Sequence, residues 1–501
     1  MRRPLCVFCV GTLGVELVCA FLPQTGLLLP FAAFFVPALL WLLFGKNSRG
    51  YGVCLLLGAL AGLLLTAHTR QKLDRVHTAY ADREVTLTAE VEEVSASYYP
   101  GVVHAVLRVE PTGGEKTVFR VECVCMPKCM AGERVQARFA LEVPARTQQL
   151  SSYADGIALS GEYLSGMKHL GPSESFRAKT ARLQRRLSAA LRKGMAQGPA
   201  GVLAAMVLGD RTHLSKDLRS AYRAAGLSHV LVVSGMHVSI LCGSVFAKYL
   251  PEKKKWERGY ASRRRQALFS AAMALLLAGV TGLTPSVLRA ATAVWVSALG
   301  VWVYGPPDAL TSLGVAGVWM TLGNSYAVCD IGFELSFAAV LGTLAGAELA
   351  RKSRRFPLLR NSVLETLCVS ACASAATFPV LVLRGLSASL YALVSSVAVL
   401  WLVEPILQLG LATALLGCWP ALAPLHRVCS LCAATLAGCL NRWALWVSGW
   451  PGAQIYFDTA CAALVCLLLL GLGWLAYHWR VRLRVALPCL VLTAALAIGL
   501  G

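Results

Sequence analysis

Histidine and serine side chains interrupt an apolar stretch in the middle of the chain. The segment GLSHVLVVSGMHVSIL (226–241) carries His229, Ser234, His237 and Ser239 among residues that suit a membrane or a protein core. Imidazole and hydroxyl groups in such surroundings need partners, because an unpaired polar group in an apolar environment is costly. These residue types therefore indicate a polar cluster that contacts other helices, water or a ligand.

Spacing leaves the function of this segment open. On a continuous helix His229 and His237 lie about 80° apart and share a broad face, which suits a wet conduit or its gate. Ser234 and His237 are three residues apart and can touch, as a nucleophile and its base do in an intramembrane serine hydrolase. The sequence identifies no orienting carboxylate and no oxyanion hole, so we assign no catalytic residue. A cluster that only locks helices together, and a small-anion transporter, are further alternatives.

The composition indicates that the helices carrying these residues lie in a membrane. Of the 501 residues 56% are hydrophobic and 15% are charged, and the mean hydropathy is +0.61. Such a composition is typical of a polytopic α-helical membrane protein. The net charge of +21 favours anionic partners, namely lipid or nucleic acid. No nucleotide-binding or metal-binding motif is found, so we expect no cofactor.

Apolar runs of about 20 residues divide the chain. We expect about thirteen spans, the first of them an uncleaved anchor, and an inserted extracytoplasmic all-β domain. The predicted divisions are three N-terminal transmembrane helices (1–67), the β domain (68–170), a basic amphipathic helix (171–199), a transmembrane core (200–420) and C-terminal transmembrane helices (421–501). The expected spans are 5–22, 26–44, 51–67, 227–247, 267–282, 285–304, 309–322, 331–349, 363–383, 386 to about 419, 428–449, 459–477 and 485–501.

Basic residues predict the orientation. Arg2 and Arg3, the loop PEKKKWERGYASRRR (251–265), RKSRR (351–355) and HWRVRLR (478–484) flank spans. Counting alternate crossings from a cytoplasmic N-terminus places all of these clusters inside and residues 68–199 outside.

The outside region alternates polar and apolar residues as strands do. Five segments show this pattern: 84–96, 104–111, 116–126, 134–144 and 156–165. Five short strands fit a small barrel of the OB type, and periodicity alone leaves a β-sandwich equally open.

A basic helix follows the strands. Phe176, Leu183, Leu187 and Leu191 form one apolar stripe. Such a helix lies on a membrane surface or, on the outer side, contacts a polyanion such as DNA. Its basic residues are Arg177, Lys179, Arg182, Arg185, Arg186, Arg192 and Lys193.

Three cysteines lie in the outside region. Cys123, Cys125 and Cys129 allow one disulfide and one free thiol, and the sequence does not say which pair forms it. A zinc site is not expected, because no fourth ligand is near.

Four blocks of the sequence, in order, resemble the ComEC family of competence proteins. They are LAAMVLGDRTHLSKDLRSAYRAAGLSHVLVVSGMHVSIL (203–241), AGVTGLTPSVLRAA (278–291), DIGFELSFAAVLG (330–342) and ATFPVLVLRGLSASLYALVSSVAV (376–399). Glu334 stands where the family usually has glutamine, and Ser395 or Ser396 where it has asparagine. Arg289 and Glu334 are expensive in a span, about 2.5–3.5 kcal/mol for the arginine, so both should face protein or water. The channel or gate candidates are Asp210, Arg211, His229, Ser234, Gly235, His237, Arg289, Glu334 and Ser336.

The resemblance implies a channel that passes one strand of DNA across the bacterial cytoplasmic membrane. Single-stranded DNA and membrane lipid are the implied partners, with a DNA receptor, a separate nuclease and a cytoplasmic DNA-translocating ATPase as further ones. Many family members continue into a metallo-β-lactamase-like domain whose metal ligands are absent from this sequence, so degradation of the other strand should need another protein. The sequence does not give the oligomeric state.

Overall fold

The computed structural model describes residues 3–21, 32–39, 49–96, 101–110, 117–235, 237–238, 240–241, 260–303, 308–353 and 362–456. The chain forms two compact units. The first comprises Met1–His213, Val233–Phe333 and Leu407–Ser430, and the second comprises Leu214–Val232, Glu334–Ile406 and Leu431–Gly501.

A closed barrel of five strands forms part of the first unit. Its strands are β1 (Arg83–Ala96), β2 (Val102–Val109), β3 (Phe119–Pro127), β4 (Glu133–Glu142) and β5 (Ile157–Pro172), and α4 (Gln149–Ala154) precedes β5. The order around the barrel is β1-β2-β3-β5-β4, and β3 pairs with β5 in parallel. Alternate side chains of β4 are buried, as the period of two requires. The predicted small barrel is confirmed, and its closure rules out a sandwich.

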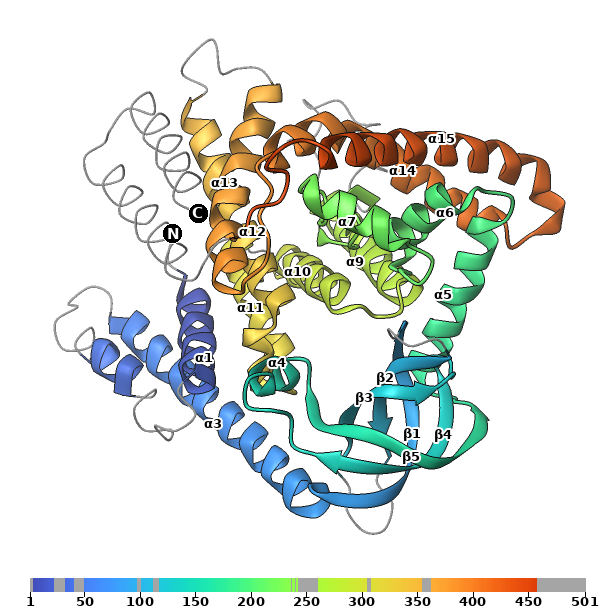
Figure 1. The fold of residues 1–501 in the computed structure, drawn as a ribbon. Helices are drawn as coiled ribbons and strands as arrows, with labels where there is room; N and C mark the ends of the chain where they lie inside the picture. Colours follow the sequence, from blue (N-terminus) through green and yellow to red (C-terminus); the bar gives the residue numbers. More distant parts are fainter. Residues whose placement is uncertain are drawn as a thin grey trace. The chain divides into compact units, whose positions relative to one another are not determined.

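One long helix joins the barrel to the apolar helices. Helix α3 (Arg49–Tyr80) has an apolar first half, and its last turns enter the barrel core with Leu73, Val76 and Tyr80. The His77 ring also bonds to the carbonyl of Ala158 on β5 at 3.0 Å. In Figure 1 the helix runs without a break from the apolar helices to the strands.

Small residues hold α3 against α1 (Pro4–Phe21). A Cβ added at Gly62 would lie 2.5 Å from the carbonyl oxygen of Thr12, and one at Gly58 would overlap the carbonyl of Phe8. Glycines therefore allow the two backbones to touch. Since both residue numbers increase together along the contact, the two helices are parallel.

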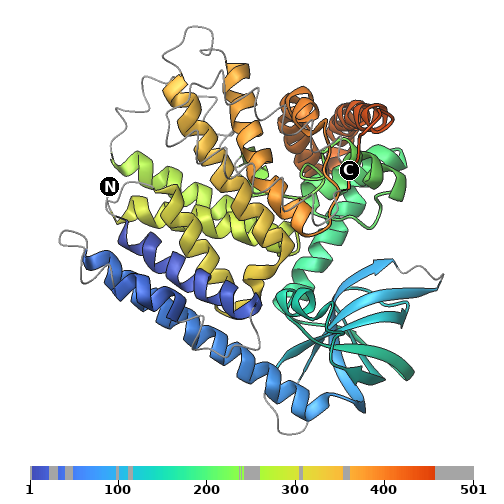
Figure 2. The same ribbon diagram turned by 60° about the vertical axis from the view of Figure 1, so that its left-hand side comes forward.

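The other helices of the first unit include one that lies beside α1. Arg3 pairs with Asp308 at 3.1 Å, just before α11 (Ala309–Thr321), and Gly314 faces Cys9. Figure 2 shows α1, α3 and the yellow helices of this unit side by side. The remaining elements are α5 (Phe176–Arg192), α6 (Gln197–Leu203), η2 (Ala204–Leu208), α9 (Tyr260–Val280), α10 (Pro285–Trp302) and η4 (Ser325–Cys329).

The second unit consists mainly of helices in its described residues. Its elements are α7 (Lys216–Ala224), nearly all of α12 (Ile331–Ser353), α13 (Ser362–Leu383), and most of α14 (Ala392–Leu416) and α15 (Ala423–Ser448), while η6 (Pro420–Leu422) lies in the first unit. Glycines again mark a close helix contact, because Gly342 and Gly346 of α12 face the backbone of α13 at Cys372 and Val369.

Within the described residues, six helices are long and apolar enough to cross a membrane. They are Pro4–Phe21, Arg49–Tyr80, Ile331–Ala350, Thr366–Leu383, Ala392–Leu416 and Pro420–Ser448. Apolar helices thus confirm the predicted class, but the count of about thirteen is not supported. Segments 285–304 and 309–322 form shorter apolar helices, and the span expected at 227–247 begins in turns. The spans expected at 459–477 and 485–501, and most of 26–44, lie outside the described residues.

Candidate functional site

Two glycines end the helices on either side of Asp210. The π-helical turn η2 stops at Gly209, whose φ of 72° is left-handed. Helix α7 stops at Gly226 (φ 73°), where the amide of Leu227 donates to the carbonyl of Tyr222 at 2.8 Å and that of Gly226 to Arg223 at 3.0 Å. This pair of bonds is a Schellman cap, for which glycine is preferred.

The Schellman cap corrects one expectation. Residues 228–230 form a turn, and the next helical residue is Gly235, so His229 and His237 do not share the face of a continuous helix. His229 is exposed in the second unit, whereas His237 is 1% exposed in the first. The apolar run hid this break because hydropathy does not register a turn.

Ser234 and His237 do touch. The Ser234 hydroxyl lies 2.8 Å from Nδ1 of His237, and the Ser234 amide donates to the same nitrogen at 3.1 Å. Because an amide can only donate, Nδ1 acts as an acceptor. His237 thus caps the helix that starts at Gly235, because its side chain reaches back to the amide of Ser234 at the N-cap position.

Arg289 binds the residue that starts α12. Its guanidinium Nη1 lies 3.4 Å from Oδ2 of Asp330, and the arginine is 8% exposed. Asp330 also accepts the amide of Phe333 at 2.8 Å and so caps α12. A Cβ at Gly332 would lie 3.3 Å from Nη2 of Arg289, so glycine leaves room for the guanidinium.

Three of the quoted sequence blocks meet around this arginine in the first unit. The Ser286 hydroxyl, one turn before Arg289, donates to the carbonyl of Val233 at 2.7 Å, directly before Ser234. A Cβ at Gly235 would lie 3.7 Å from Ala290. The site therefore contains Ser234, His237, Arg289 and Asp330. Sequence reasoning missed Asp330 and Ser286, although both lie in the quoted blocks.

Glu334 belongs to the second unit and has its own partner. Arg384, after α13, donates from Nε to Oε2 of Glu334 at 2.9 Å and from Nη2 to Oε1, a bidentate pair. The expectation that Glu334 faces protein or water fits this contact, but its partner was not foreseen. Ser336 is half-buried on α12.

Asp210 fastens helix α5 to the loop after η2. It accepts the Ser188 hydroxyl at 2.5 Å and the Thr212 amide at 3.0 Å. Burial acts to raise the pKa of this carboxyl, but the bonds from Ser188 and Thr212 and the nearby His213 outweigh it, so the pKa lies below its ordinary value. Arg211 is exposed beside it.

The basic residues predicted for α5 fall into two groups in the structure, those that contact other protein groups and those that are exposed. Arg177 pairs with Glu92 at 2.9 Å, Arg182 donates to the Ser173 carbonyl at 2.8 Å, and Arg185 contacts Met130. Arg192 bonds back to Ser188, while Lys179, Arg186 and Lys193 are exposed. The apolar stripe divides as well: Leu187 and Leu191 are buried, but Phe176 and Leu183 are exposed.

The three cysteines considered for a disulfide, Cys123, Cys125 and Cys129, are free thiols. Cys123 and Cys129 are buried and Cys125 is exposed. Burial, followed by the neighbouring Cys129 and Glu122, raises the pKa of Cys123 to about 12. Burial and then Glu133 raise the pKa of Cys129 to about 11.

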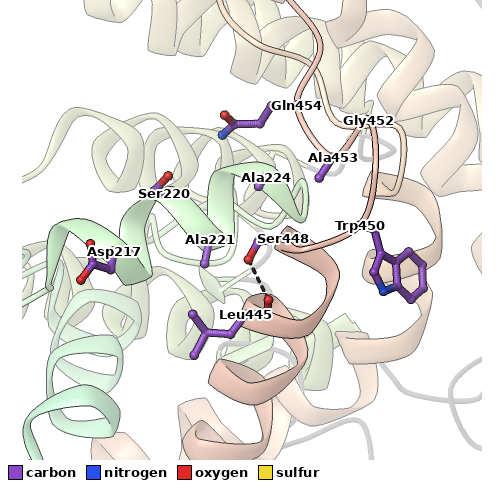
Figure 3. A pocket seen from close by; sticks show the side chains of 10 residues that line it. All are labelled: Asp217, Ser220, Ala221, Ala224, Leu445, Ser448, Trp450, Gly452, Ala453 and Gln454. Carbon is purple, nitrogen blue, oxygen red and sulfur yellow. Dashed lines mark hydrogen bonds between the residues drawn. The ribbon is translucent and has the colours of Figure 1, made fainter.

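A pocket in the second unit lies apart from these candidates. It has a volume of about 490 Å³ and is lined by α7, by the end of α15 and by residues 450–454 (Figure 3). Asp217, Ser220 and Gln454 supply polar groups. None of the residues predicted as site candidates lines it.

Comparison with known proteins identifies the family. A family model described as "Competence protein" matches residues 206–482, more than half of the chain. The chain belongs to the competence protein family. It is 24% identical over 218 residues to "ComE operon protein 3" of Bacillus subtilis (strain 168), a match that covers 44% of this chain and 26% of that relative. The matched part is thus about a quarter of the relative's length. No solved structure matches the chain.

Proposed function

We propose that this chain is a channel that passes single-stranded DNA across the cytoplasmic membrane during natural transformation. Membership of the competence protein family and the apolar helices support the proposal. The main structural support for the proposal is that three of the sequence blocks contact one another around Arg289, because a buried guanidinium is well suited to bind phosphate. DNA, membrane lipid, a DNA receptor, a separate nuclease and a DNA-translocating ATPase are the proposed partners, and the role is that of a conduit rather than an enzyme.

The barrel is proposed to be of the OB type and to lie on the extracytoplasmic side of the membrane. Closure through the parallel pair of β3 and β5 supports this type. The parallel packing of α1 and α3 supports the predicted topology, in which the first and third spans cross the membrane in the same direction. A cysteine introduced at Gln148 should then react with an impermeant reagent in intact cells, and one at Lys254 should not. Labelling at Lys254 would overturn the orientation.

The site of Arg289 is tested by separating surface binding of DNA from entry. Deletion of the gene should abolish entry of labelled DNA into the cytoplasm. Arg289→Ala and His237→Ala should stop entry while surface binding persists, and Arg289→Lys should keep part of it because the charge remains. Arg264→Ala is the control, since Arg264 on α9 contacts Trp302 instead. Wild-type entry in Arg289→Ala, at normal membrane levels, would show that the arginine is only structural.

The exposed residues of α5 are proposed to contact the DNA backbone. Lys179, Arg186 and Lys193 are available, whereas Arg182 is bound to the Ser173 carbonyl. Three phosphate contacts to a single strand imply a log–log salt slope of roughly −2. Reversing all three charges should remove that slope from DNA binding by the purified full chain, and Arg182→Ala should leave it. Binding of anionic vesicles without DNA binding would instead identify α5 as a membrane anchor.

One observation favours a second function. The 2.8 Å contact of Ser234 with His237 is the contact of a nucleophile with its base. A fluorophosphonate probe that labels the wild type but not Ser234→Ala would establish the hydrolase and count against the channel. Absence of labelling is expected, because the same histidine nitrogen also accepts the Ser234 amide and so serves to cap a helix.

A further inference from the structure

A single glutamate is buried among the helices near the N-terminus. Glu16 lies on α1 and is 1% exposed. It is twelve residues after Pro4, about 18 Å along the helix axis, and so lies within a segment apolar enough to cross a membrane. The function proposed above does not use this residue.

The hydroxyl groups around Glu16 are bonded elsewhere. Thr12 of α1 donates to the Gly58 carbonyl of α3 at 3.1 Å, and Thr66 of α3 donates to Gly62 at 2.8 Å. Thr321 of α11 faces the carboxyl, but its hydroxyl donates to the Val318 carbonyl at 3.1 Å. Within the described residues both carboxyl oxygens of Glu16 are buried without a hydrogen-bond partner.

No cation approaches the carboxyl closely enough to form an ion pair in the described part of the chain. Arg70 of α3 donates instead to the Cys19 carbonyl at 2.8 Å, one helical turn beyond Glu16. Cys9 and Cys19 are further titratable groups on the buried side of α1. The packed segment η4 adds Tyr326 and Cys329, and α11 faces Glu16 with Thr321.

An unpaired carboxylate in apolar surroundings is unstable, and such a group exists there as the neutral acid. We propose that Glu16 is a proton-binding site of the membrane helices, which holds its proton while α1, α3 and α11 are packed and releases it when water reaches the cluster. This proposal goes beyond DNA transport and does not depend on it.

A proton fits this cluster better than a metal cation does. Hard cations in proteins take about six or more oxygen ligands, including several carboxylates or free carbonyls. Here there is one carboxyl, and the hydroxyl protons of Thr12 and Thr66 already occupy nearby carbonyls. The carboxyl itself needs only one proton to become compatible with its surroundings.

An apolar carbodiimide provides the test, because it reacts with protonated carboxyls in apolar sites. The acid proton moves to a carbodiimide nitrogen, the carboxyl oxygen adds to the central carbon, and the acyl group then migrates to nitrogen, so the whole reagent is retained and nothing leaves. In vesicles that contain the full chain, mass spectrometry should find the adduct on Glu16. Glu334 is the matched control, because Arg384 donates to both of its carboxyl oxygens.

The expected results are specific. Labelling of Glu16 should be strongest at low pH and fall as pH rises, since only the acid reacts. Glu16→Gln should abolish the adduct at this position, and Glu16→Asp should retain it. A water-soluble carbodiimide should label Glu16 at least tenfold less than the apolar reagent.

Two outcomes would overturn the proposal: no adduct on Glu16 at low pH, or equal labelling of Glu16 and Glu334. Because labelling requires no DNA, it separates this proposal from the transport function. If gene deletion leaves DNA entry normal while Glu16 is labelled, transport fails and the proton site stands. In transforming cells, entry lost in Glu16→Gln and kept in Glu16→Asp would join the two, and entry kept in both would show that proton binding is not used for DNA entry.

Discussion

Glu92 and Glu16 are both buried glutamates of the first unit, and their surroundings are opposite. The Glu92 side chain on β1 is 5% exposed and pairs with Arg120 at 2.7 Å and with Arg177 at 2.9 Å. Glu16 on α1 is 1% exposed and has no ion pair in the described residues. At the barrel, arginines compensate the charge of buried Glu92. Among the apolar helices, Glu16 has no such partner in the described residues and is in its neutral form.

Local structure explains the difference. The register of β1 against β2 shifts between Val91 and Glu93, so Glu92 sits at a bulge, where a side chain is re-aimed. Neighbouring strands and α5 bring arginines there whose own ends reach water. Helix α1 instead meets glycines and threonines on α3, which allow close packing but bring no charge.

Removing the compensated charge should have the largest effect. Glu92→Ala leaves Arg120 and Arg177 without their carboxylate, and because these arginines are 31% and 43% exposed the loss should be about 3 kcal/mol, at the low end for a broken buried pair. Urea dependence of thiol labelling at buried Cys123 measures opening of the barrel, with exposed Cys125 as the reference. The control Glu93→Ala, at an exposed neighbour, should change little.

Removing the arginine partner of Glu334 should make this carboxyl react with the apolar carbodiimide as Glu16 does. The change Arg384→Leu removes both donors to this carboxyl. The expected loss of stability is about 2 kcal/mol. Arg442→Leu, at an exposed arginine of α15, is the control. An unreactive Glu334 in Arg384→Leu would mean that pairing does not decide reactivity.

Asp210 should give a smaller effect that depends on pH. Its folded-state pKa lies below the ordinary value of 3.8, so its stabilisation is present above that value and is lost as pH falls through the lower folded-state pKa. Asp210→Asn should lower stability at neutral pH by about 1 kcal/mol and flatten this acid dependence. Thermal unfolding at a series of pH values measures both, with the exposed Asp74→Asn as control.

The smallest effect is expected at Glu16 itself. If the carboxyl is already neutral, the amide of Glu16→Gln replaces it with the same shape, and stability should change by less than about 0.5 kcal/mol. Thermal unfolding of the purified chain measures the change. A loss as large as that of Glu92→Ala would show that Glu16 is ionised and would remove the contrast between the two regions.

The barrel could be predicted from the sequence because its signal is local. Alternation in 84–96 and 134–144 located β1 and β4 within a few residues. The segment 226–241 failed for the opposite reason, since its apolar residues satisfy a hydropathy window while Gly226 and Ser234 set a helix end and a helix start.

The ion-pair partners of the buried charged residues were the second feature that the sequence did not predict. Arg289 and Glu334 could be recognised as groups that need a partner, but Asp330 and Arg384 lie 41 and 50 positions away in the chain. Only the packing of helices decides which of several charges is reached. Asp330 had one available signal, since aspartate directly before an apolar helix is a preferred N-cap.

Helix α3 gives the first unit mechanical continuity. Its 32 residues form a rod of about 48 Å whose one end is clamped to α1 by glycine contacts and whose other end is embedded in the barrel. A force applied to the strands is therefore transmitted along this single helix to the pair of α1 and α3, which packs around Glu16.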